Sequence, residues 1–137
     1  MTNRVTNVAV LGSTGSIGRS ALEVIAASQG QLRAVALAAC NSTTVLLEQA
    51  QAARPRRVVA ADESAAQRQD WSSLPVGVKL LTGAEAVAQL AADADIDIVL
   101  SAIVGSAGLR STWAALEAGK TVALANKESL VVGGPLV

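Results

Sequence analysis

Three glycines near the start of the chain stand where a peptide backbone could bind phosphate. Residues 7–18 read Asn-Val-Ala-Val-Leu-Gly-Ser-Thr-Gly-Ser-Ile-Gly, so that an apolar run leads directly to Gly12, Gly15 and Gly18. An amphipathic stretch follows at once. This order predicts a strand, a tight turn and the start of a helix, whose unpaired N–H groups attract anions. We therefore interpret the turn as a binding site for the pyrophosphate of a dinucleotide.

The glycine pattern alone is common, and its spacing departs from the most familiar motif. Two residues, Ser13 and Thr14, separate the first two glycines, where the usual motif has one. The alternative is a purely structural turn. The apolar strand expected over residues 8–11 and the helix expected over residues 17–27 favour nucleotide binding, and the hydroxyls of Thr14 and Ser16 stand at the mouth of the turn.

A second group of polar residues follows the second expected strand. In NAD-specific domains, a carboxylate about 20 residues past the glycines usually holds the hydroxyls of the adenine ribose. Here Cys40, Asn41 and Ser42 occupy that region. This region contains no carboxylate that would repel a 2′-phosphate, and it contains amide and hydroxyl donors. The sequence therefore favours NADP(H). The alternative is that residues 41–44 only cap the next helix, although a cap and an anion site are compatible.

A third group, Asn126, Lys127 and Glu128, follows the last expected strand. An amide, an ammonium and a carboxylate in succession are not typical of a hydrophobic core. This group is expected at the carboxyl edge of the parallel sheet, which is where ligands bind. We expect this group to face the glycine turn and to meet the nicotinamide and a substrate, with the turn at residues 105–108 on the same rim. Residues 127–130 are expected to form the first turn of another helix. Alternatively, therefore, Asn126 only caps this helix, and Glu128 suits its positive end.

Strand-like and helix-like segments alternate along the whole chain. This alternation predicts an α/β fold, a Rossmann-like doubly wound and mainly parallel sheet with helices on both faces. The expected order of the five main strands is third, second, first, fourth, fifth, with the cofactor crevice between the first and fourth. The strands are expected at 8–11, 33–39, 57–60, 96–102 and 120–124, with a short extra one at 78–81, and the helices at 17–27, 45–53, 62–71, 84–92 and from the turn at 104–108 to 118–119.

Composition excludes several classes of function. The length of 137 residues suits one domain over residues 1–137. The formal net charge is zero, whereas proteins that bind nucleic acid usually carry an excess of positive charge. No apolar run approaches the roughly 20 residues that span a bilayer, and the polar start is too short for a secretion signal. The single Cys40 suits a reducing compartment, so a cytoplasmic location is expected. Because His is missing, a Ser-His-Asp triad is excluded, and neither catalytic nor metal-binding residues are assigned.

Three segments of the chain resemble the amino-terminal, NADPH-binding domain of the 1-deoxy-D-xylulose 5-phosphate reductoisomerase family. They are residues 11–18 (Leu-Gly-Ser-Thr-Gly-Ser-Ile-Gly), 102–108 (Ala-Ile-Val-Gly-Ser-Ala-Gly) and 124–130 (Leu-Ala-Asn-Lys-Glu-Ser-Leu). The first segment is shared more widely, whereas the last is highly specific to this family. The resemblance extends from about residue 7 to residue 137.

The resemblance implies roles for individual residues. Family members often carry a glycine and then an asparagine at the end of the second strand, and this chain departs from that pattern. The matching positions are Thr14, Gly15, Ser16 and Ile17 for the pyrophosphate and nicotinamide, Cys40, Asn41 and Ser42 for the adenosine phosphate, Asn126 and Glu128 for the nicotinamide side, and Lys127 for the substrate.

The resemblance also implies an activity in isoprenoid biosynthesis by the non-mevalonate pathway. The family rearranges a phosphorylated sugar, 1-deoxy-D-xylulose 5-phosphate, and reduces it with NADPH to 2-C-methyl-D-erythritol 4-phosphate. Its divalent metal, Mg²⁺ or Mn²⁺, is held by acidic residues beyond the Asn-Lys-Glu group, so we expect this chain to bind NADPH without turnover on its own. The family's members pair as homodimers. Two alternatives remain: a different NADP-dependent dehydrogenase, of the aspartate-semialdehyde or dihydrodipicolinate type, and a non-catalytic NADP(H)-binding or sensing module.

Overall fold

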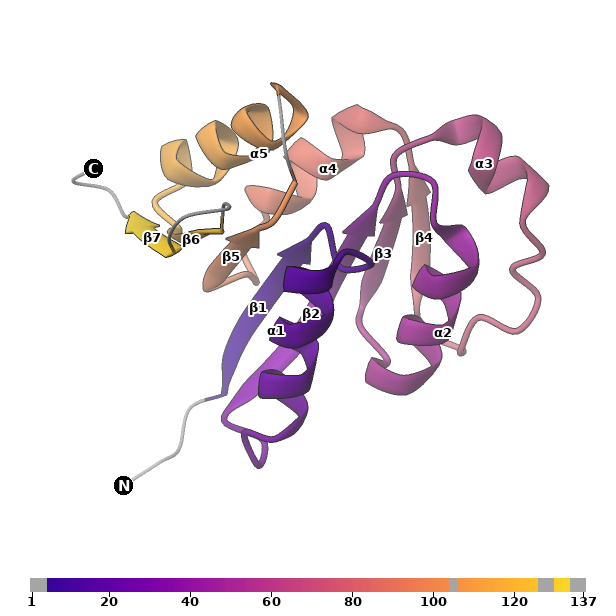
Figure 1. Cartoon of the computed structure of the whole chain (residues 1–137), viewed down its shortest axis with the longest axis horizontal. Coiled ribbons are helices and arrows are strands. Elements are labelled where there is room, and N and C mark those ends of the chain that lie inside the picture. Colours follow the sequence, from indigo (N-terminus) through magenta and orange to yellow (C-terminus); the bar gives the residue numbers. More distant parts are fainter. Residues whose placement is uncertain (1–4, 104–105, 126–129, 134–137) are drawn as a thin grey trace.

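A single sheet with helices on both faces forms the centre of the molecule (Figure 1). The computed structural model describes residues 5–103, 106–125 and 130–133. Within them, the strands are β1 (Thr6–Leu11), β2 (Leu32–Ala39), β3 (Arg57–Ala60), β4 (Lys79–Thr82), β5 (Ile98–Ser101), β6 (Thr121–Ala125) and β7 (Leu130–Gly133). The helices are α1 (Ser16–Ala26), α2 (Thr43–Ala53), α3 (Glu63–Arg68), α4 (Ala84–Ala91) and α5 (Ser106–Glu117).

The order of the strands confirms the predicted topology. They lie in the order β4-β3-β2-β1-β5-β6-β7, and the pairs from β4 to β6 are all parallel. The extra short strand, β4, extends the sheet beyond β3. The carboxyl ends of β1 and β5 lie side by side, because Leu11 pairs with Ser101, and this junction is where the chain reverses its direction of winding.

Successive residues of β1 enter different cores, as expected for a sheet covered on both faces. Val8 and Val10 belong to one core, to which α2 and α3 also contribute and against which side chains of α1 pack. Ala9 and Leu11 belong to the other core, with residues of α4 and α5. Figure 1 shows α1 and α2 on one side of the sheet and α4 and α5 on the other. The predicted doubly wound α/β fold is thus confirmed.

The expectation of a helix after β6 is wrong for residues 130–133. These residues form β7, which pairs antiparallel with β6 through partners such as Ala123 and Val132. Pairing with β6 favours the strand, because it satisfies backbone hydrogen-bonding groups along the outer edge of β6. The rest of the predicted first turn, residues 127–129, lies outside the described residues.

Helix α3 ends earlier than the expected boundary near Trp71. Asp62 precedes it as the N-cap, and the Asp62 carboxylate accepts a hydrogen bond from the Ala65 amide. At the other end, Gln69 is already extended, with φ −89° and ψ 139°. The indole N–H of Trp71 donates to the carbonyl oxygen of Ala66 at 2.9 Å, so the tryptophan folds back over the last turn instead of continuing it.

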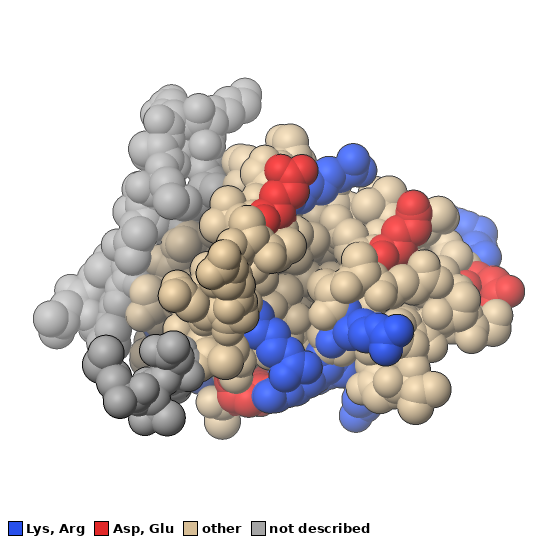
Figure 2. Space-filling model, turned by 90° about the horizontal axis from the view of Figure 1, so that it is seen from below, with Lys and Arg blue, Asp and Glu red and all other residues tan. Residues whose placement is uncertain are grey.

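Ion pairs connect the amino ends of the strands to the loop before β5. Arg57 pairs with Asp93 and, at 2.7 Å, with Asp95, to which Arg56 also donates at 2.7 Å. Figure 2 views the molecule from this end and shows acidic and basic side chains next to one another. Burial raises the pKa of the Asp95 carboxyl, but the hydrogen bonds and positive charges of Arg56 and Arg57 outweigh burial and hold that pKa below its usual range.

Candidate functional site

The turn after β1 is fixed by the strand ends on both sides of it. The amides of Gly12 and Ser13 both donate to the carbonyl oxygen of Ala38, at 2.8 and 3.0 Å. Gly12 has φ +85°, and a Cβ there would lie 2.9 Å from the carbonyl oxygen of Ala102. Glycine is therefore required at this position for its backbone conformation and for the close approach of the chain after β5.

The other two glycines differ in what surrounds them. A Cβ on Gly18 would lie 2.6 Å from the Cα of Ser13 and would also collide with the carbonyl oxygen of Gly12, so α1 packs directly on the turn. A Cβ on Gly15 would meet only the carbonyl oxygen of Gly12, at 3.7 Å, which is an ordinary contact. The space in front of Gly15 is open to a ligand.

Two side chains that sequence reasoning missed hold the carbonyl groups of the turn. Gln49, on α2, donates from Nε2 to the carbonyl oxygen of Ser13 at 2.8 Å. Arg19, on α1, donates from Nε to the carbonyl oxygen of Thr14 at 2.8 Å. Because these carbonyls are bound from the helix side, the peptide planes of the turn are held in fixed orientations.

The first amides of α1 have no partner within the described chain. Gly15 is the N-cap, with extended backbone and no capping side chain, and the first helical bond runs from the amide of Arg19 to the carbonyl oxygen of Gly15 at 2.9 Å. Among the described residues, none accepts a hydrogen bond from the amides of Thr14, Ser16 and Ile17. The first turn of α1 contains no acidic side chain. The positive end of α1 therefore lacks a negative partner from the described chain.

A cavity of about 700 Å³ lies against this turn, at the carboxyl edge of the sheet. Its walls come from the glycine turn, from the ends of β2, β3 and β5, and from one side of α4 and α5. Most of the lining side chains are small and apolar. The lining residues are Gly12, Thr14, Gly15, Ala38, Ala39, Cys40, Ala61, Ala84, Val87, Ala88, Ala102, Ile103, Arg110 and Ser111.

The four residues predicted around the turn are adjacent in space. Thr14 and Gly15 line the cavity, and Ser16 and Ile17 form the first turn of α1 beside them. Ile17 is 41% exposed, so it is accessible at the start of α1.

The residues predicted at the end of β2 are only partly in the cavity. Cys40 lines it, whereas Asn41 and Ser42 are exposed outside the lining. Ser42 stands at the N-cap position of α2, but its side chain makes no capping bond, and the hydroxyls of Thr43 and Thr44 donate to Oε1 of Gln69 at 3.0 and 3.1 Å. The alternative that these side chains only cap α2 is therefore wrong, and the amino end of α2 lacks a side-chain cap.

The end of β2 has a carboxylate beside it that the sequence did not indicate. The amide of Asp62 donates to the carbonyl oxygen of Cys40 at 3.0 Å, so the N-cap of α3 lies next to this strand end. Asp62 lies far beyond the position about 20 residues past the glycines, and it reaches the end of β2 through the parallel pairing of β2 and β3. Its carboxylate accepts from the amide of Ala65 at 3.2 Å and so serves the helix cap.

The third predicted group, Asn126, Lys127 and Glu128, lies outside the described residues. In the part of the chain that the structure describes, no three His, Cys, Asp or Glu side chains gather in an arrangement that could hold a metal ion. The described residues therefore do not fit the divalent-metal site of the resembled family. No helix within the described ranges is long and apolar enough to cross a membrane.

Comparison with known proteins shows similarity to one family over nearly the whole chain. The model of the family described as 1-deoxy-D-xylulose 5-phosphate reductoisomerase matches residues 8–134. The chain is 50% identical to the reductoisomerase of Rhodococcus jostii (strain RHA1) over 136 residues, which cover 98% of the chain and 33% of that protein. It is 48% identical to that of Anaeromyxobacter sp. (strain K) over 130 residues, which cover 95% of the chain and 33% of that protein. The chain thus spans about a third of the length of these curated relatives.

Solved structures show the same similarity. The reductoisomerase from Zymomonas mobilis in complex with NADPH matches with a TM-score of 0.81 and 38% identity, over 92% of this chain and 33% of that one. A reductoisomerase in complex with magnesium matches with a TM-score of 0.80 and 36% identity, over 92% of this chain and 32% of that one. As its three sequence segments predict, the chain belongs to the 1-deoxy-D-xylulose 5-phosphate reductoisomerase family.

Proposed function

We propose that the glycine turn of this chain binds the diphosphate of NADPH. The observation that carries the proposal is the set of unpaired amides of Thr14, Ser16 and Ile17 at the uncapped positive end of α1. Anionic oxygens satisfy such donors, and Gly15 leaves the space that a diphosphate needs. A relative with 38% identity has been solved in complex with NADPH, which supports the same ligand here.

The ends of β2 and α2 would hold the adenosine phosphate. Cys40 lines the cavity, and the exposed Asn41 and Ser42 follow it at the uncapped amino end of α2. Their amide and hydroxyl groups can donate to a 2′-phosphate. The carboxylate of the neighbouring Asp62 accepts a hydrogen bond from the amide of Ala65 at the start of α3. This bond limits the repulsion between that carboxylate and a 2′-phosphate.

For the whole protein, we propose the activity of the family, the NADPH-dependent rearrangement and reduction of 1-deoxy-D-xylulose 5-phosphate. Residues 1–137 would be its NADPH-binding domain, and NADPH would supply the hydride. Asn126 and Glu128 are proposed to contact the nicotinamide side and Lys127 the phosphorylated sugar, because the segment that contains them is the one most specific to the family. Pairing into a homodimer is part of the same proposal.

Isothermal titration calorimetry of the chain with NADPH and with NADH tests this proposal. We expect one site that binds NADPH, with NADH bound more weakly because it lacks the 2′-phosphate. Binding of neither coenzyme would refute the proposed site. Tighter binding of NADH than of NADPH would refute the assignment of Asn41 and Ser42, while leaving the glycine turn intact.

A further inference from the structure

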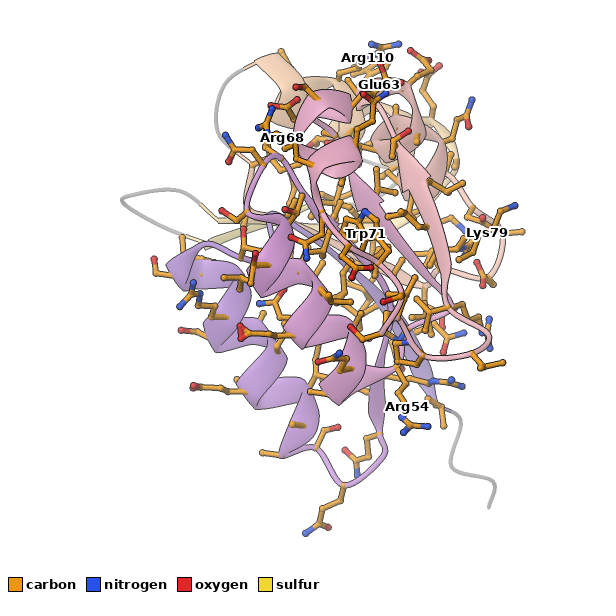
Figure 3. The ribbon with its side chains drawn as sticks, turned by 90° about the vertical axis from the view of Figure 1, so that its right-hand side faces the viewer. Arg54, Glu63, Arg68, Trp71, Lys79 and Arg110 are labelled. Carbon is orange, nitrogen blue, oxygen red and sulfur yellow. The ribbon has the colours of Figure 1, made fainter. Side chains whose placement is uncertain are left out.

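One wall of the nucleotide cavity carries a cation that the motifs do not explain. Arg110, on α5, is the one cationic side chain among the described residues that line the cavity. Its Nη2 pairs with a carboxylate oxygen of Glu85, in the first turn of α4, and the Arg110 side chain is 56% exposed. Figure 3 shows Arg110 at the end of the molecule toward which the strands point.

The guanidinium lies on the adenosine side of the cavity. Glu85 directly follows Ala84, which lines the cavity, and the amide of Gly83 donates to the carbonyl oxygen of Ala60 at the end of β3, at 3.1 Å. The first turn of α4 is thus beside β3. With the diphosphate at the turn after β1, as proposed above, the adenosine half of a dinucleotide extends toward β2 and β3. The Arg110–Glu85 pair stands where the adenine would lie.

An adenine ring favours a flat partner, and this chain has few. It contains no Phe, Tyr or His and only two Trp. Neither Trp71 nor Trp113 lines the cavity, and the remaining walls on this side are small aliphatic groups such as Ala61 and Ala88. A guanidinium is planar, weakly hydrated and able to stack on a π-face. The ion pair with Glu85 restricts the orientation of this guanidinium, which lowers the entropy that Arg110 would lose on contact with a ligand.

We infer that the Arg110 guanidinium is the surface on which the adenine of the coenzyme stacks, with the alanines of α4 at its side. This inference rests on the proposed binding of NADPH. Since NADPH and NADH share the adenine, the contact strengthens the binding of both coenzymes by the same factor. Arg110 therefore contributes to affinity and leaves the choice between them to the end of β2.

Calorimetry on Arg110→Met tests the inference, because methionine keeps an aliphatic stem and lacks the planar group. We expect NADPH, NADH and ADP-ribose each to bind about tenfold more weakly, with the ratio between the two coenzymes unchanged. Arg110→Lys keeps the charge without the plane and should show the same loss. Lys79→Ala, which removes a cation at the amino edge of the sheet, is the matched control and should bind as the wild type does.

Three results would overturn the inference. A loss confined to NADPH would show that Arg110 contacts the 2′-phosphate. Full affinity in Arg110→Lys would show that charge matters and stacking does not, and full affinity in Arg110→Met would show that no contact exists. Circular dichroism melting of each variant establishes that it is folded. Failure of the proposed function is a separate result, because the wild type would then bind neither coenzyme.

Discussion

Gly15 and Gly18 are three residues apart at the start of α1, yet substitution of each is expected to have a different effect. A side chain at Gly18 should lower stability, whereas a side chain at Gly15 should weaken ligand binding. In Gly18→Ala the new Cβ would lie 2.6 Å from the Cα and 2.8 Å from the carbonyl carbon of Ser13. These are backbone atoms, so no change of rotamer relieves the clash. Overpacking of this kind costs about 3 kcal/mol, and the higher helix propensity of alanine returns about 1 kcal/mol. We expect the free energy of unfolding to fall by about 2 kcal/mol, which lowers Tm by about 5–10 °C.

Gly15→Val is expected to keep the fold and lose the ligand. The backbone at Gly15 is extended, with φ −77° and ψ 172°, and the nearest atom to a Cβ is 3.7 Å away. Loss of glycine from the N-cap position costs about 1 kcal/mol. The valine, however, fills the space in front of the unpaired amides. Each charge-assisted hydrogen bond that is lost costs about 1.5–3 kcal/mol, so the loss of two weakens NADPH binding by at least about 100-fold.

Thermal melting and calorimetry on the two variants separate these effects. The expected pattern is a large fall of Tm in Gly18→Ala, and a small fall of Tm with loss of NADPH binding in Gly15→Val. Wild-type affinity in Gly15→Val would refute the assignment of the turn to the diphosphate. An unchanged Tm in Gly18→Ala would refute the close packing of α1 on the turn.

Two further predictions concern the support of the site and of the sheet. Gln49→Ala removes the hydrogen bond to the carbonyl oxygen of Ser13. It should lower the free energy of unfolding in urea by about 1 kcal/mol and also weaken NADPH binding, and an unchanged affinity would show that this bond does not orient the turn. Asp95 has a pKa below its usual range in the folded state, so its ionised form stabilises the fold above about pH 4, and that contribution is lost as the pH falls through the lower folded pKa. Stability should therefore decline less steeply below about pH 4 in Asp95→Asn than in the wild type, and parallel curves of stability against pH from urea melts would contradict this.

The elements and their order were predictable because they depend on local patterns and on one general rule. The apolar runs and glycines identify the strands and turns, and the doubly wound arrangement of dinucleotide-binding sheets then gives the order of the strands. The end of α3 was not predictable in the same way. It depends on the Trp71 indole reaching the carbonyl oxygen of Ala66, which no propensity describes. Strand β7 depends likewise on its pairing with β6, a property of the assembled sheet.

The candidate site likewise contains residues that the sequence predicts and residues that it does not. Thr14 and Gly15 are predictable because their spacing places them in one turn. Gln49 and Arg110 belong to no recognisable motif. Gln49 is 36 residues from its partner Ser13, and Arg110 is 25 residues from its partner Glu85. Asp62 was not predictable from its distance along the chain, because it reaches the end of β2 from the neighbouring strand β3.

A crystal structure of the chain with NADPH tests the central claim most directly. We expect diphosphate oxygens within hydrogen-bond distance, about 2.7–3.2 Å, of the backbone nitrogens of Thr14, Ser16 and Ile17. Coenzyme bound with its diphosphate at any other edge of the sheet, while these three amides still face solvent, would contradict it.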